Sequence, residues 1–271
     1  LAFSEIENFN IFGGLLLAGI TGIVVIGGLK RIAEVATFLV PLMGSIYFGA
    51  MIVALMQNLN LVLPAFKLIF IDAFNGTAIA GGTFFGVLIY GVRRGAFSNE
   101  AGMGTESLVH GVAKVSNPVK QGLVAMTGPI FDTLIICTAT ALMILVSGVW
   151  ETSSSQGVTL TAEAFSILLG SFGGLILFVC VICFGLSTIF TYSYYGASCS
   201  RFLFGKFGMK FYIYLYILSI FIYSIVPIDI AINIADGAFA MMAIPTLISA
   251  LWLAPKVMQA SKNYFKLIDN N

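Results

Sequence analysis

Charged residues are scarce in this 271-residue chain, because Lys, Arg, Asp and Glu make up 9% of it and the formal net charge is +1. Because the basic and acidic residues nearly cancel, the chain offers no basic surface for nucleic acid. Hydrophobic residues make up 59% of the chain, and the mean hydropathy is +1.02. Several apolar runs approach the ~20 residues that a membrane-spanning helix needs, which is typical of all-α polytopic membrane proteins.

Histidine and cysteine are also few. His110 is the only histidine, so no more than one nucleophile–histidine pair could form. The sequence has no GxSxG, HExxH or Walker-type motif. Cys180 and Cys183 form a CxxC, but no second Cys/His pair completes a zinc site. We therefore expect neither an enzyme nor a protein with an organic cofactor or a transition metal.

Polar or Gly/Pro-containing breaks divide the chain into seven predicted spans. They lie near residues 11–28, 36–57, 80–97 (continuing to about 115), 121–148, 165–195, 208–226 and 230–254. The segment 61–74 is shorter than these spans, and its apolar pattern includes Lys67 and Asp72, which suits a helix at the membrane interface. The segments ETSSSQG after Trp150 and SNPVK before Gln121 predict turns.

The positions of the basic residues predict the orientation of these spans. Basic residues near span ends concentrate on the cytoplasmic side of a membrane. In the connections on one side of the predicted spans, the only basic residue is Lys67, so this side faces away from the cytoplasm; Arg93 and Arg94 lie within a predicted span. The first crossing then runs from outside to inside, and the C-terminus is cytoplasmic. The other ten basic residues fall in the alternate connections: Lys30, Arg31, Lys114, Lys120, Arg201, Lys206, Lys210, Lys256, Lys262 and Lys266.

The stretch from residue 95 to residue 111, GAFSNEAGMGTESLVHG, is polar and rich in small residues, although its neighbours are mainly Leu, Ile, Val and Phe. Its glycines, together with Ser98 and Asn99, weaken a helix at this point. If the break lies at membrane depth, free carbonyls of one half can coordinate a cation, and free amides of the other can hold a carboxylate. A polar cytoplasmic loop is the alternative interpretation.

Other polar side chains lie inside the predicted spans. Asp132 and Asp236 are candidates for a functional role because carboxylates are costly at membrane depth, but a structural pair with Arg93 or Arg94 is an equal alternative. Another span carries four hydroxyl groups, on Ser187, Thr188, Thr191 and Tyr192. Such hydroxyls can bind a small cation, or they can bond back to carbonyls of their own helix.

Residues 93–145, RRGAFSNEAGMGTESLVHGVAKVSNPVKQGLVAMTGPIFDTLIICTATALMIL, resemble the most characteristic segment of the alanine/glycine:cation symporter family. GGLKRIAEVATFLVPLMGSIY, STIFTYSYYG and IADGAFAMMAIPTL match further family segments in the same order, so the resemblance covers essentially the whole chain. It implies sodium-coupled uptake of small neutral amino acids such as alanine and glycine, by alternating access across the cell (inner) membrane.

The resemblance also implies the five-plus-five inverted-repeat fold. Residues 1–271 would form a single transmembrane transporter domain that begins near the fourth core helix. The first residues, LAFSEIENFNIFGG, show neither an initiating Met nor a signal peptide, so we interpret the chain as a fragment without the N-terminal helices. We expect a monomer in the lipid bilayer. From the residues alone, a channel-like or structural membrane protein without coupled transport is the alternative.

The implied substrate site begins at the break. The unwound segment would contact the backbone groups of the amino acid through Asn99, Ala101, Gly102 and Gly104. Hydroxyl groups of the eighth core helix would lie near the sodium ion (Ser187 and Thr188) and the substrate (Thr188).

Tyr192 stands where the family commonly has Trp, at the side-chain end of the pocket. Its smaller ring suggests a pocket that admits side chains larger than a methyl group. The sequence also has Thr105-Glu106-Ser107 where Ser-Ala-Pro is usual, and Thr246 where Asn is usual. Because Glu106 adds a carboxylate close to the expected site, the ion stoichiometry or proton sensitivity can differ from that of the family.

Overall fold

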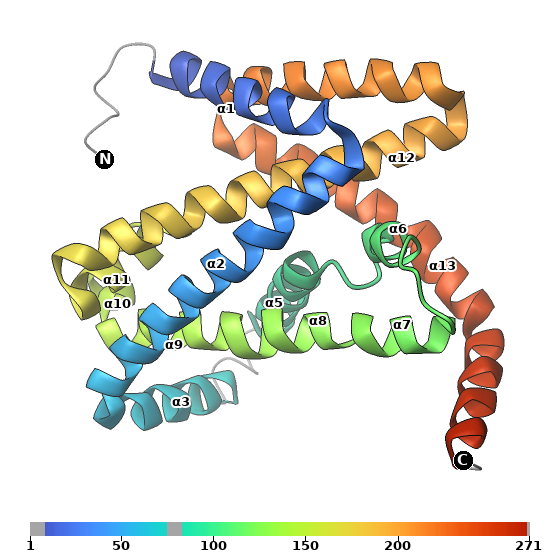
Figure 1. Ribbon diagram of the computed structural model, residues 1–271. Coiled ribbons are helices and arrows are strands. Elements are labelled where there is room, and N and C mark those ends of the chain that lie inside the picture. Colours follow the sequence, from blue (N-terminus) through green and yellow to red (C-terminus); the bar gives the residue numbers. More distant parts are fainter. Residues whose placement is uncertain (1–8, 75–82, 270–271) are drawn as a thin grey trace. The chain divides into compact units, whose positions relative to one another are not determined.

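The computed structural model describes residues 9–74 and 83–269, and within these ranges it contains helices and no strand. The start of the expected span at 80–97 lies outside the described residues. The helices are α1 (Phe9–Val25), α2 (Gly28–Gln57), α3 (Leu59–Ala73), α5 (Thr83–Asn99), α6 (Thr105–His110), α7 (Pro118–Ala125), α8 (Thr127–Pro129), the π-helix η1 (Ile130–Cys137), α9 (Thr138–Ser147), α10 (Val149–Thr152), α11 (Val158–Leu169), α12 (Ser171–Ile225) and α13 (Ile228–Asp269) (Figure 1).

Four of the described helical stretches are long and apolar enough to cross a membrane, at residues 30–57, 118–147, 171–225 and 230–268. They support a polytopic membrane protein, as the composition predicted. The count of seven spans stays a prediction. Non-helical backbone follows α10 and precedes α7, as the expected turns after Trp150 and before Gln121 predicted, but residues 151–152 belong to α10 and residues 118–120 to α7.

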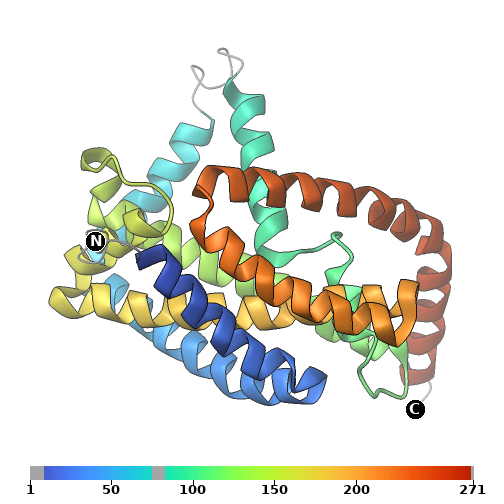
Figure 2. The ribbon, with the colours of Figure 1, turned by 90° about the horizontal axis from the view of Figure 1, so that it is seen from above.

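Some helix boundaries differ from those expected. α2 begins at Gly28 and so includes Lys30 and Arg31. The segment 165–195 contains a break at Gly170, which has a φ of 67° and separates α11 from α12. Gly205, with a φ of 68°, kinks α12 into two arms, and Figures 1 and 2 show the chain turning back there. Glycine adopts such a positive φ without the steric cost that a Cβ imposes.

The chain divides into two compact units. The first contains the described residues up to Met43 together with 182–244, and Val24, Val25, Ile32 and Phe190 form a core in it. Within this unit the two arms of α12 are joined by a hydrogen bond of 2.8 Å, which the Tyr216 hydroxyl donates to the Ile189 carbonyl.

The second unit contains the described residues of 44–181 and 245–271. In its core the Tyr47 ring stacks on Phe165 at a centroid distance of 5.5 Å, and the Tyr47 hydroxyl lies 2.9 Å from Thr140 Oγ1. Leu142 and Val146 on α9 pack with Ala65 on α3. These contacts hold α9, which continues directly from η1. The η1 segment lies against α5, and the predicted break follows the last turn of α5.

Candidate functional site

The predicted interruption of the helix near Asn99 is confirmed. α5 ends at Asn99, residues 100–104 are not helical, and α6 begins at Thr105. Glu100, Gly102 and Gly104 have φ angles of 55°, 82° and 93°. Since non-glycine residues rarely adopt such angles, Glu100 marks a strained point in the loop. The depth of this loop in a bilayer stays a prediction.

The side chain of Asn99 bonds to the loop that follows α5 and to η1. Its Nδ2 donates to Thr133 Oγ1 at 2.8 Å, and its Oδ1 accepts from the Ala101 amide at 2.9 Å. The neighbouring Ser98 hydroxyl donates to Asp132 Oδ2. Asn99 therefore pairs with the Ala101 amide of the loop, and it connects the loop to η1.

The two glycines that were expected at the site lie against the middle of α13. A Cβ built on Gly104 would lie 2.8 Å from Thr246 Oγ1, and one on Gly102 would lie 3.5 Å from Leu247 Cδ2. A side chain at position 104 would therefore displace Thr246. The loop needs glycine there for its backbone angle and also for this close approach.

Thr105 was not predicted as a site residue. Its side chain is 1% exposed, and its Oγ1 has no hydrogen-bond partner. A buried polar atom without a partner marks a position where a ligand or a water molecule can bind. The sequence gives no sign of this burial, because Thr105 lies among polar residues that are equally compatible with a solvated loop.

Asp132 and Thr133 lie in η1, whose π-helical geometry was also not predicted. π-Helical turns are rare and often occur at functional sites. Asp132 accepts from Ser98 and Thr133 rather than from an arginine. Arg93 lies over the Phe97 ring at 5.6 Å and Arg94 over the Tyr90 ring at 5.1 Å.

The predicted hydroxyls on α12 belong to the first unit. Ser187 is buried and donates to the Phe184 carbonyl at 2.9 Å, while Thr191 donates to the Ser187 carbonyl at 2.8 Å. These hydroxyls thus bond back to their own helix, and the lone pairs of their oxygens stay able to accept or coordinate. Thr188 is exposed.

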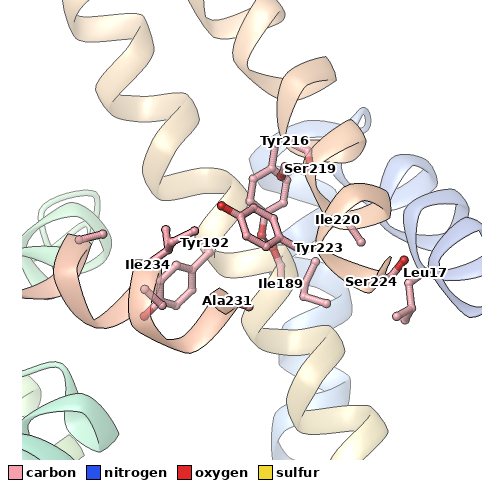
Figure 3. A pocket seen from close by; sticks show the side chains of 12 residues that line it. Leu17, Ile189, Tyr192, Tyr216, Ser219, Ile220, Tyr223, Ser224, Ala231 and Ile234 are labelled. Carbon is pink, nitrogen blue, oxygen red and sulfur yellow. Dashed lines mark hydrogen bonds between the residues drawn. The ribbon is translucent and has the colours of Figure 1, made fainter. Parts of the chain in front are cut away.

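Tyr192 lies in the wall of a pocket of about 690 Å³ in the same unit (Figure 3). Its ring contacts Phe239 edge-on, at a centroid distance of 6.2 Å. Three other hydroxyls around the pocket bond to backbone carbonyls, those of Tyr216, Ser219 and Ser224. The pocket is therefore mainly apolar and suits a hydrocarbon group better than a charged one.

The predicted substrate residues fall in both units, and their meeting in one site stays a prediction. In the second unit, Asn99 ends α5, and Ala101, Gly102 and Gly104 lie in the loop that follows. Ser187, Thr188 and Tyr192 follow one another on α12 in the first. Over the described ranges, no group of three or more His, Cys, Asp or Glu side chains could hold a metal ion.

A model of the sodium:alanine symporter family matches residues 2–271. The chain is 37% identical over 273 residues to the uncharacterized transporter YflA of Bacillus subtilis, covering 98% of this chain and 58% of that protein. It is 36% identical over 270 residues to the sodium/alanine symporter AgcS of Methanococcus maripaludis, covering 97% of this chain and 59% of that protein.

A third relative is the probable sodium/glutamine symporter GlnT of Bacillus subtilis. It is 34% identical over 252 residues, covering 93% of this chain and 53% of that protein. The chain thus spans less than two thirds of the length of these curated relatives.

Proposed function

The chain belongs to the sodium:alanine symporter family, and from this premise we propose that the whole protein is a secondary active transporter. It couples the inward movement of sodium to the uptake of small neutral amino acids, alanine and glycine, by alternating access. The family and the relatives named above are transporters, so the expectation that the chain is not an enzyme is confirmed.

The observation that carries the proposal is the interruption between α5 and α6. The helix end at Asn99 presents carbonyls, and the start of α6 at Thr105 presents amides. An amino acid carries a carboxylate and an ammonium group, and these two helix ends offer complementary partial charges. The close approach of Thr246 to Gly104 encloses this loop on one side.

The proposed residues divide by role. The loop binds the backbone groups of the amino acid through Asn99, Ala101, Gly102 and Gly104. On α12, Thr188 and Tyr192 contact the substrate, and Ser187 and Thr188 ligate sodium. The buried position of Ser187 supports its role, because a dehydrated cation needs oxygen ligands that are held away from water.

The proposal includes the architecture. Residues 1–271 belong to a single transporter domain of the five-plus-five inverted-repeat type, with about seven spans in this chain, in the cell (inner) membrane. Four long apolar helices support the membrane location. The ten basic residues that the sequence analysis assigned to alternate span ends support a cytoplasmic C-terminus. We expect the protein to act as a monomer.

Binding can be tested without transport. Alanine should raise the melting temperature of purified full-length protein in sodium chloride but not in choline chloride, because a ligand that binds the folded state stabilises it. Glutamate serves as the charged control and should have no effect. An equal rise in both salts would argue against a shared sodium and amino-acid site, and no rise in either would favour a structural membrane protein.

A further inference from the structure

The helix α1 and the second arm of α12 lie side by side in the first unit, as Figures 1 and 2 show. A Cβ built on Gly14 would overlap the Ser224 side chain, and one on Gly22 would lie 3.6 Å from Ile217 Cδ1. Residue numbers thus rise along α1 as they fall along the arm, so the two helices run in opposite directions. The start of the arm, after Gly205, therefore lies toward the end of α1.

These two helices form the walls of a groove of about 810 Å³. Among the described residues, it shares no lining side chain with the pocket that contains Tyr192. Leu15, Ile23 and Ile26 line the groove, and they are 57%, 64% and 63% exposed. In a membrane, apolar walls of this kind contact hydrocarbon instead of water.

The groove has the length of a lipid chain. At roughly 1.5 Å per residue, its α1 wall is about 15 Å long from Leu15 to the end of α1 at Val25. Each leaflet supplies about half of the ~30 Å hydrocarbon core of a bilayer, so one acyl chain can lie along this wall. The small residues Ala18, Gly19 and Gly22 leave room for it on the α1 side.

Arg31 lies at the end of the groove where α1 passes into α2. Its Nη1 donates to the Ile23 carbonyl at 3.1 Å, and a guanidinium has further N–H donors that can bind an anion. Among the described residues, no carboxylate lies within ion-pair distance of Arg31, whereas the neighbouring Lys30 pairs with Glu34 at 3.9 Å. This end of the groove therefore carries a positive charge that the described carboxylates do not neutralise.

A second basic side chain comes from the arm. Lys210, Tyr214 and Ile217 follow one another at helical spacing, so they share one face of the arm, and the last two line the groove. Because the start of the arm lies toward the end of α1, Lys210 and Arg31 lie at the same end of the groove. Tyr214, one helical turn from Lys210, has the amphipathic ring that is typical of a membrane interface.

From the apolar walls and the basic end we propose that the groove binds an anionic phospholipid of the cytoplasmic leaflet. One acyl chain lies between α1 and the second arm of α12, and the phosphate group accepts hydrogen bonds from Arg31 and Lys210. Basic pockets between membrane-spanning helices on the cytoplasmic side bind anionic headgroups, and the proposed orientation assigns both residues to that side. The site is separate from the proposed substrate and sodium sites, so it goes beyond the proposed function.

The headgroup is tested by native mass spectrometry of the purified full-length protein, titrated in detergent with dioleoylphosphatidylglycerol or dioleoylphosphatidylcholine. The wild type should bind the anionic lipid more tightly. The double variant Arg31→Gln/Lys210→Gln should lower the phosphatidylglycerol affinity by about tenfold or more, because two basic groups no longer face the phosphate. Lys256→Gln/Lys262→Gln is the matched control on α13 in the second unit, and it should bind like the wild type.

The acyl chain is tested by filling the groove. A Cβ built on Gly19 or on Gly13 meets nothing within 4 Å, and only Gly19 lines the groove. Gly19→Leu should therefore weaken the binding of both lipids, while Gly13→Leu, in the same helix, should leave it unchanged.

Equal affinities of the wild type for the two lipids would overturn the proposal, and so would unchanged phosphatidylglycerol affinity in the Arg31→Gln/Lys210→Gln variant. Unchanged lipid binding in Gly19→Leu would overturn it as well. If that variant also melts at a lower temperature than Gly13→Leu, protein covers the groove, either from the rest of the full-length chain or from a second copy. If Gly19→Leu does not fold, the Arg31→Gln/Lys210→Gln variant decides.

Discussion

The Asn99 side chain makes two hydrogen bonds at the end of α5. Its amide nitrogen bonds to Thr133 and its amide oxygen to the Ala101 backbone, so one side chain sets both the end of α5 and the course of the loop. Removal of this side chain leaves the Ala101 amide and the Thr133 hydroxyl without that partner. The cost of an unmatched buried polar group is about 1–3 kcal/mol.

Asn99→Ala should therefore weaken alanine binding by an amount equivalent to roughly 1–3 kcal/mol, while the protein still inserts and purifies. Asn58→Ala is the matched control, because Asn58 also bonds to a backbone carbonyl, that of Ala54, between α2 and α3. Isothermal titration in sodium chloride measures both affinities. Unchanged alanine affinity in Asn99→Ala would support a cytoplasmic loop instead of a binding segment.

Tyr192 tests the side-chain end of the proposed substrate site. Because hydrophobic pockets distinguish a methylene by about 1–3 kcal/mol, a larger ring should change selectivity more than stability. Tyr192→Trp should shift uptake toward glycine and alanine and away from serine and valine, with sodium dependence retained. Competition between these amino acids for uptake measures the ratio.

The control is Tyr214→Trp, at an exposed tyrosine on the second arm of α12. This change should leave the ratio of uptake rates as it is in the wild type. The same ratio in Tyr192→Trp and in the wild type would remove Tyr192 from the substrate site.

At the scale of the elements, residue types that weaken a helix allowed a helix break to be predicted from the sequence. Ser98, Asn99 and the following glycines predicted the break, and it is present. The break at Gly170 lies within a continuous apolar run, and hydropathy does not report backbone angles.

Lys30 and Arg31 suggested a loop, yet α2 includes both residues, and Arg31 donates to the Ile23 carbonyl near the end of α1. Charged side chains can cap a neighbouring helix.

The π-helical geometry of η1 was also not predicted from the sequence. A π-helix differs from an α-helix by hydrogen bonding to the fifth residue instead of the fourth, and the apolar sequence of η1 is compatible with both. Asp132 and Thr133 were recognised as polar residues in a span. Their contacts with Ser98 and Asn99 depend on the packing of α5 against η1, which no local pattern encodes.

The packing of the two arms of α12 provides a stability test at this scale. A Cβ on Gly196 would collide with the ring of Tyr212, whereas a Cβ on Gly185 in the same helix meets nothing within 4 Å. Gly196→Ala should lower the stability by about 1–3 kcal/mol through overpacking. Gly185→Ala should be neutral or stabilising, because alanine favours a helix over glycine. Melting temperatures in detergent would compare the two, and equal values would contradict the close packing of the arms.

At the scale of the whole molecule, coupling distinguishes a symporter from a channel. A symporter binds sodium and the amino acid before it changes conformation, so a sodium gradient can concentrate the amino acid. A channel lets its substrate move only down its own gradient. A break that binds an amino acid and a separate sodium site are both required by the first mechanism, and the proposed roles of Asn99 and Ser187 follow from it.

Uptake of labelled alanine into liposomes that contain the full-length protein tests this claim most directly. With an inward sodium gradient, the internal alanine concentration should rise above the external one and saturate with alanine concentration. Collapse of the sodium gradient at the same external sodium concentration should abolish the accumulation. Equal alanine uptake with every cation gradient collapsed would contradict sodium-coupled symport.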